Sequence, residues 1–127
     1  MNQFDTQRVF RDYNRDGIVR IHQFFSEAEV DRVREEIDRY ILEDLDSKPA
    51  DAATREADGV TVRNLWRLEQ HNPFLRELSD RKSIRNLVAP LVGGQPILQG
   101  VETFNKSAKV GSAVPDHRSG CHGPVRR

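Results

Sequence analysis

Residues 26–45 carry the strongest helix signal of the chain. Ser26 is followed three positions later by Glu29, which is the pattern of a capping box. Apolar side chains then recur at every third or fourth position and define one face of a helix over residues 27–45: Val30, Val33, Ile37, Tyr40 and Ile41. These positions predict an amphipathic helix, which is the clearest element that the sequence indicates.

Weaker signals predict the other elements. The β-branched run Ile18 to Ile21 after Gly17 predicts a strand, and the polar stretch 46–59 predicts a mobile connection. The remaining predictions are an extended segment over 60–68, a short helix from Asn72-Pro73 through Leu78, a helix from Lys82 to Leu91 that ends or kinks before Pro90 and stops at Gly93-Gly94, and strand-like residues over 96–104.

Charge and length limit the classes of partner. The 127 residues suit one domain, and 20 basic side chains balance 20 acidic ones. This balance gives no electrostatic case for nucleic acid or an anionic membrane, and no apolar run approaches the roughly 20 residues that span a bilayer. The N-terminal residues MNQFDTQRVF do not resemble a signal peptide, and the lone cysteine fits a reducing compartment, so a cytoplasmic location is expected.

Asp12 to Gly17 match the first half of a calcium loop, in which oxygen ligands alternate and a glycine makes the sharp turn. The twelfth position is Gln23 instead of a bidentate glutamate, and Arg20 occupies the ninth. The alternative interpretation is a polar turn before a strand.

A second set of metal-ligand residue types lies near the end of the sequence. His117, Cys121 and His122 have side chains that suit zinc, but their spacing matches no common zinc template. The alternative is that these are unpaired polar groups in a glycine-rich tail.

Three ordered segments together resemble the N-terminal half of a phytanoyl-CoA dioxygenase family protein. The first is Asp16 to Ile21 with Phe24-Phe25-Ser26, the second is Asn72 to Leu75 with Ile84 to Gly94, and the third is Glu102 to Lys106 with Val110 to Pro115 and His117. The resemblance covers roughly residues 8–117.

This resemblance implies an α+β fold in which N-terminal helices pack on part of a double-stranded β-helix (jelly-roll). It also implies a dioxygenase that uses Fe(II) and 2-oxoglutarate to hydroxylate a small organic substrate, with two histidines and one carboxylate as iron ligands. His117 matches the first histidine, and Lys106 matches a lysine in the loop near the iron. From the residues themselves, Arg63 and Arg67 flank Trp66 on an extended segment and are candidates for an acidic cosubstrate pocket, with surface arginines as the alternative.

The sequence departs from the family pattern at the iron site. The family pattern has an aspartate two residues after the first histidine, whereas here Arg118 and Ser119 follow His117. Asp116 precedes the histidine, and adjacent residues of a strand point to opposite faces, so Asp116 does not replace that ligand. We therefore expect residues 1–115 to form the N-terminal portion of the domain and residues 116–127 to be an unmatched, disordered tail.

These departures predict a truncated fragment that is inactive alone and that self-associates through exposed strand edges. The sequence leaves two other functions open. One is a binding or interaction module without catalysis, and the other is a calcium-binding protein that uses Asp12 to Gly17.

Overall fold

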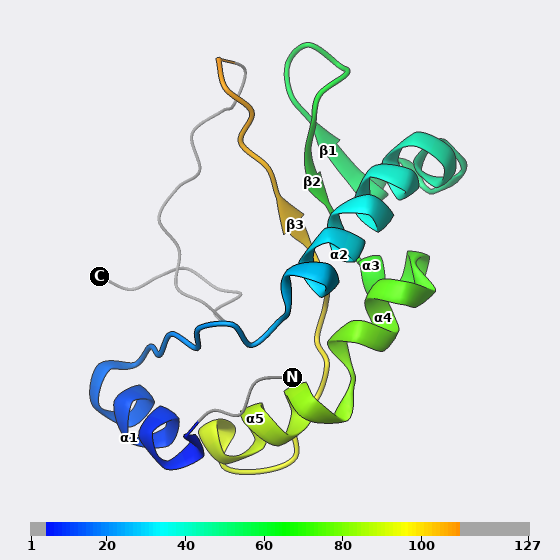
Figure 1. The fold of residues 1–127 in the computed structure, drawn as a ribbon. Helices are drawn as coiled ribbons and strands as arrows, with labels where there is room; N and C mark the ends of the chain where they lie inside the picture. The colour runs from blue at the N-terminus through cyan, green and yellow to red at the C-terminus, as the bar shows by residue number, and fades with distance from the viewer. Residues whose placement is uncertain (1–4, 110–127) are drawn as a thin grey trace, which may run out of the picture.

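The computed structural model describes residues 5–109, which form short helices and a small three-stranded antiparallel sheet (Figure 1). In chain order the helices and strands are α1 (Thr6–Asp16), α2 (Glu27–Arg39), β1 (Ala53–Arg55), β2 (Val62–Leu65), α3 (Leu68–His71), α4 (Pro73–Ser79), α5 (Lys82–Val92) and β3 (Thr103–Phe104). Helices α1 and α5 lie together, away from the sheet. A π-helical turn (Tyr40–Asp44) and a 3₁₀ turn (Leu45–Ser47) prolong α2, and a second 3₁₀ turn (Ala50–Ala52) leads into β1. Every helix in this part of the chain is too short or too polar to span a lipid bilayer.

The sheet has the strand order β1-β2-β3, with both pairs antiparallel. Leu65 of β2 lies between Ala53 and Thr103, and its side chain points toward α2. Because successive side chains of a strand alternate, the neighbouring residue Asn64 belongs to the opposite face. One face of the sheet is therefore covered by α2, and the other lies away from it.

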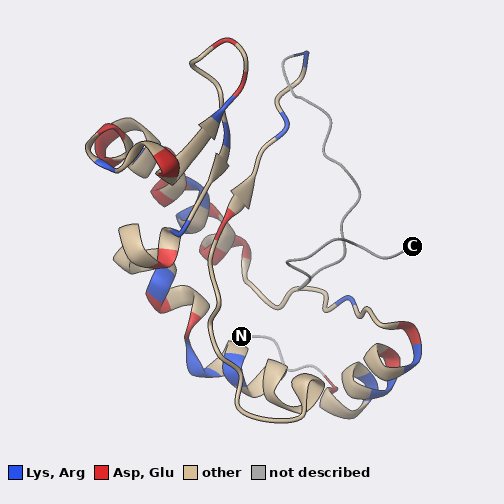
Figure 2. Cartoon of the chain, turned by 180° about the vertical axis from the view of Figure 1, so that it is seen from behind, with Lys and Arg blue, Asp and Glu red and all other residues tan. Residues whose placement is uncertain are grey.

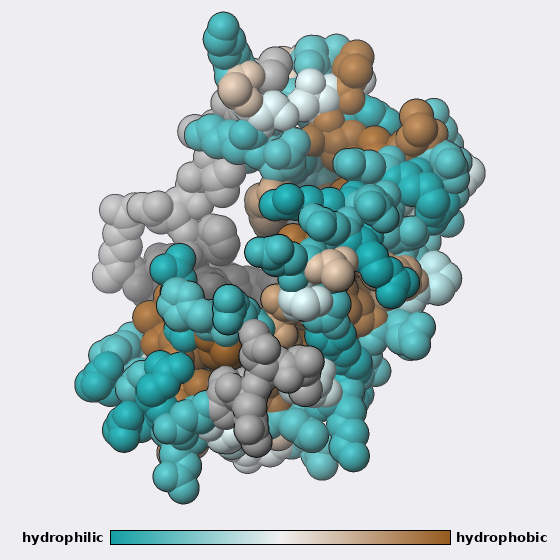
Figure 3. Space-filling view, viewed as in Figure 1, coloured by the Kyte–Doolittle hydropathy of each residue, from teal (hydrophilic) through white to brown (hydrophobic). Residues whose placement is uncertain are grey.

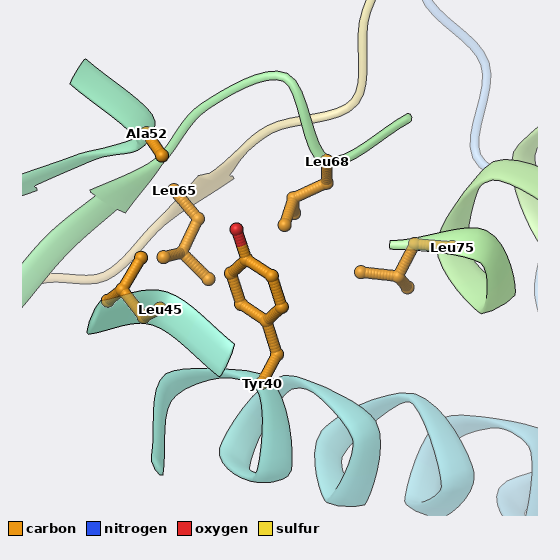
Figure 4. Close-up of a cluster of buried hydrophobic side chains, with 6 residues drawn as sticks. All are labelled: Tyr40, Leu45, Ala52, Leu65, Leu68 and Leu75. Carbon is orange, nitrogen blue, oxygen red and sulfur yellow. The ribbon is translucent and has the colours of Figure 1, made fainter. Parts of the chain in front are cut away.

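The main core forms where the end of α2 meets this sheet and α4 (Figure 4). Its buried members are Tyr40, Leu45, Ala52, Leu65, Leu68 and Leu75. Each large apolar side chain contributes about 1.5–3 kcal/mol by leaving water. Tyr40 points into the middle of this cluster, where burial raises the pKa of its hydroxyl group.

The helix predictions are confirmed where local capping signals were present. Ser26 and Glu29 make both hydrogen bonds of the capping box, at 3.1 and 3.0 Å. The Asn72 side chain accepts the Leu75 N–H at 2.9 Å and so begins α4. Gly93 ends α5 in the left-handed conformation with φ +73°, while Pro90 is accommodated inside the helix instead of ending it.

Two predictions for connecting segments are wrong, and one helix was not predicted. The helix that was not predicted is α1 over residues 6–16, which packs against α5. Ile18 to Ile21 form no strand, and Ile18 is 74% exposed, because none of the strands within residues 5–109 lies beside this segment to accept its backbone hydrogen bonds. The stretch 46–59 is not a mobile connection: it contributes buried Ala52 and strand β1.

The α+β class is confirmed by the helices and the three-stranded antiparallel sheet. The double-stranded β-helix and the truncation stay predictions. The predicted tail, residues 116–127, lies outside the described residues.

Candidate functional site

The sheet face that lies away from α2 carries a cluster of aromatic and polar side chains. Thr54 pairs with Asn64, and Asn64 pairs with Phe104, so these three residues share one face. Trp66 lies two residues after Asn64 and joins the same face. We call Thr54, Asn64, Trp66 and Phe104 the aromatic face.

Trp66 is held in a fixed orientation by two neighbours. Its indole Nε1–H donates to Thr54 Oγ1 at 2.8 Å, and its ring packs edge-to-face on Phe104 with centroids 5.8 Å apart. Asn64 is buried and directs its amide toward the Thr103 carbonyl at 3.4 Å. The result is an apolar wall with one amide and one hydroxyl group, which suits contact with an organic molecule and supplies no acid or base.

Lys106 lies just beyond β3 and is exposed. The pairing of β3 with β2 continues past the strand, because the Asn105 N–H donates to the Arg63 carbonyl at 2.7 Å. Period-two alternation from Phe104 places Lys106 on the same side of the sheet as the aromatic face. Lys106 is thus a cation at the margin of this face.

The two arginines that flank Trp66 do not converge on it. Arg63 lines a cavity on the α2 side of the sheet. Arg67 has a left-handed backbone (φ 52°), and its guanidinium group contacts the carbonyl and the carboxylate of Asp51, each at 2.9 Å. Arg67 and Lys106 lie at opposite ends of β2, and the cofactor roles of both residues stay predictions.

The predicted metal ligand His117, together with Cys121 and His122, lies outside the described residues. Within residues 5–109, no group of three or more histidine, cysteine, aspartate or glutamate side chains is arranged to hold a metal ion. The side chains of residues 5–109 therefore do not fit an iron centre by themselves.

The calcium-loop interpretation of Asp12 to Gly17 is wrong. Asp12 and Asp16 lie on helix α1, whereas calcium ligands at alternate positions need a looped backbone. The two carboxylates bind arginines instead: Asp12 contacts Arg8 at 3.3 Å, and Asp16 contacts Arg15 at 2.8 Å. These contacts stabilise the helix, and Gly17 serves as its C-cap.

Sequence reasoning missed two members of the aromatic face, Asn64 and Thr54. Thr54 lies in the stretch expected to be a mobile connection, and its partner Trp66 is 12 residues away. No local pattern reports such a pairing, because it depends on the register between β1 and β2.

Comparison with known families adds the remaining evidence. The model of the phytanoyl-CoA dioxygenase family matches residues 13–127, which is nearly the whole chain. No curated protein and no solved structure matches it significantly. The family match agrees with the ordered motifs of the sequence, and the chain belongs to the phytanoyl-CoA dioxygenase family.

Proposed function

We propose that this chain contributes to an Fe(II)- and 2-oxoglutarate-dependent oxygenase that hydroxylates a small organic substrate. The observation that carries the proposal is the family match over residues 13–127. In this family type, iron and 2-oxoglutarate supply the oxidising power for attack on a C–H bond. The aromatic face supports the proposal as a preformed surface for an organic molecule.

The cosubstrate would be held by cationic side chains at this sheet. Lys106 is exposed beside the aromatic face and would form a charge-assisted hydrogen bond with a carboxylate of 2-oxoglutarate. Arg67 would have to give up its contacts with Asp51 before it could do the same. Lys106 is therefore the stronger of the two candidates.

For the metal, the sequence supplies His117 as one matched ligand. Ser119 stands where the family pattern has a carboxylate, and metal affinity depends on the complete ligand set. We expect residues 1–127 alone to bind Fe(II) weakly and to release negligible succinate from 2-oxoglutarate.

Two measurements test these statements separately. Trp66 is the lone tryptophan, so its fluorescence reports directly on the aromatic face. Addition of 2-oxoglutarate should change this fluorescence, Lys106→Ala should weaken the response, and Lys82→Ala, an exposed lysine on α5, should not. No response, or equal loss in both variants, would refute cosubstrate binding at Lys106.

The second measurement is succinate release in the presence of iron, ascorbate and 2-oxoglutarate. We expect no release above a metal-free control. Release that exceeds the control and disappears in His117→Ala would refute the incomplete iron site while supporting the oxygenase activity.

A binding module without catalysis is a second candidate function. It is favoured by Ser119 in place of the metal carboxylate and by an aromatic face that uses no metal. Cooperative thermal unfolding of the chain, with substrate-like molecules altering Trp66 fluorescence equally with and without iron, would support it. A response that requires iron would count against it.

The predicted partners also stay proposals. Of the strands in residues 5–109, β1 and β3 are the outer ones of the sheet, and open strand edges pair readily with other chains. We expect the sedimentation coefficient of the chain to rise with concentration. The small-molecule substrate, the lack of nucleic-acid and membrane partners and the cytoplasmic location rest on the sequence alone.

A further inference from the structure

A cavity of about 280 Å³ lies between α2 and α4, apart from the aromatic face. Two helical stripes form its walls, because residues three, four and seven positions apart share one side of a helix. The lining residues are Glu29 and Arg32 from α2, Phe74, Glu77 and Leu78 from α4, and Arg81 at the start of α5.

Glu29 and Arg81 neutralise each other at one end of this cavity. The Arg81 guanidinium donates to the Glu29 carboxylate at 2.7 Å and lies 5.1 Å from the centre of the Phe25 ring. The hydrogen bond from Arg81, with a second from the Ser26 N–H, holds the pKa of Glu29 below its usual value. Glu29 and Arg81 bind each other, so neither charge is available to a ligand.

Arg32 and Glu77 differ from Glu29 and Arg81 in the contacts that their charged groups make. Arg32 stacks over the Phe74 ring at 5.4 Å, which leaves the N–H edge of its guanidinium group available as a donor. Neither Arg32 nor Glu77 has an ion-pair partner within 4 Å among the residues that the structure describes. The cavity thus offers one available cation and one available anion.

Phe74 and Leu78 supply an apolar floor between these charges. Figure 2 shows that α2 and α4 each carry residues of both signs, and Figure 3 shows apolar surface on α4 beside the charged surface of α2. A complementary ligand therefore carries both charges and an apolar body.

We propose that this cavity binds a free α-amino acid with an apolar side chain. The ligand carboxylate pairs with Arg32, its ammonium group pairs with Glu77, and its side chain lies on Phe74 and Leu78. The volume is slightly below the range of about 300–1,000 Å³ that accommodates drug-sized ligands, which agrees with a small ligand. This site is separate from the proposed oxygenase function and does not depend on it.

Calorimetric titration of the full chain with L-leucine tests the site. Two analogues remove one charge each: 4-methylpentanoate lacks the ammonium group, and 3-methylbutylamine lacks the carboxylate. We expect L-leucine to bind at least about tenfold more tightly than either analogue, since each analogue leaves one charged side chain unpaired. Equal affinity for all three, or no heat with about 10 mM L-leucine, would overturn the proposal.

Substitutions identify the residues responsible. Arg32→Gln and Glu77→Gln should each weaken L-leucine binding about tenfold. The matched controls Arg11→Gln and Glu35→Gln remove exposed charges outside the cavity and should leave the affinity unchanged. Circular dichroism confirms that each variant is folded. Equal losses in the control variants would show a general charge effect and refute the assignment.

Discussion

Asn72 joins two helices through one buried side chain, and its replacement gives the sharpest test of the packing described above. Asn72 is 1% exposed. Its Oδ1 accepts the Leu75 N–H at 2.9 Å, and its Nδ2 donates to Glu36 Oε1 on α2 at 2.9 Å. Arg39 also donates to that Glu36 oxygen at 2.6 Å. Asn72→Ala removes the cap of α4 and the link to α2 together.

The expected cost follows from these two hydrogen bonds. Loss of an N-cap costs about 0.5–2 kcal/mol. Loss of a hydrogen bond to a charged group costs about 1.5–3 kcal/mol, and the lower end applies because Arg39 still pairs with Glu36. We expect Asn72→Ala to lower the free energy of unfolding by about 2–4 kcal/mol, which for a chain of this size lowers Tm by roughly 6–15 °C.

Thermal unfolding followed by circular dichroism separates the two contributions. Asn72→Ser keeps a capping oxygen but cannot reach Glu36, so it should lose only the link between the helices. Ser26→Ala removes an exposed cap of α2 and should cost about 1 kcal/mol. If Asn72→Ala loses no more stability than Ser26→Ala, the buried link contributes nothing and the reasoning is wrong.

Three further predictions concern substitutions of single residues. Tyr40→Phe should raise stability by about 1 kcal/mol, because the buried hydroxyl has no acceptor among the described residues; a lower Tm would reveal a hidden partner. Arg39 holds the pKa of Glu36 below its usual 4.5. The ionised Glu36 therefore contributes to folding stability in full above about pH 4.5, and this stability is lost as the pH falls through the lowered pKa. Glu36→Gln should therefore flatten the decline of Tm on acidification, and an unchanged slope would contradict this. Gly93→Ala should cost about 1–2 kcal/mol in a urea titration because its φ is +73°, while Gly94→Ala, a position with no positive φ, should cost clearly less.

The helices with clear local signals were predictable from the sequence. Ser26 with Glu29, Asn72 with Pro73, and Gly93 after an apolar periodic run each act within a few residues of their own backbone. Helix α1 was missed although Asp5 caps it and Gly17 ends it, because much of its surface is charged and Val9 is its one buried residue. The β-branched run Ile18 to Ile21 has strand propensity, but among the described residues it has no partner strand, so the strand prediction for it is wrong.

The candidate site was predictable only in part. Trp66 was singled out with its neighbours in sequence and Lys106 by its match to the lysine loop of the family, but the sequence also grouped Arg63 and Arg67 with Trp66. Strand alternation separates Arg63 from Trp66, and Asp51 engages Arg67. Thr54 belongs to the site because β1 pairs with β2, and no local sequence pattern predicts that pairing.

The sequence by itself determined the family and the helices whose ends are capped locally, because motif order and capping depend on residues close together in the chain. The tertiary structure decided which polar segment becomes β1, which face of β2 meets α2, and which charges stay available between α2 and α4. Those outcomes depend on the register and packing of segments far apart in sequence. Their hydrogen bonds and buried contacts exist only once the segments meet.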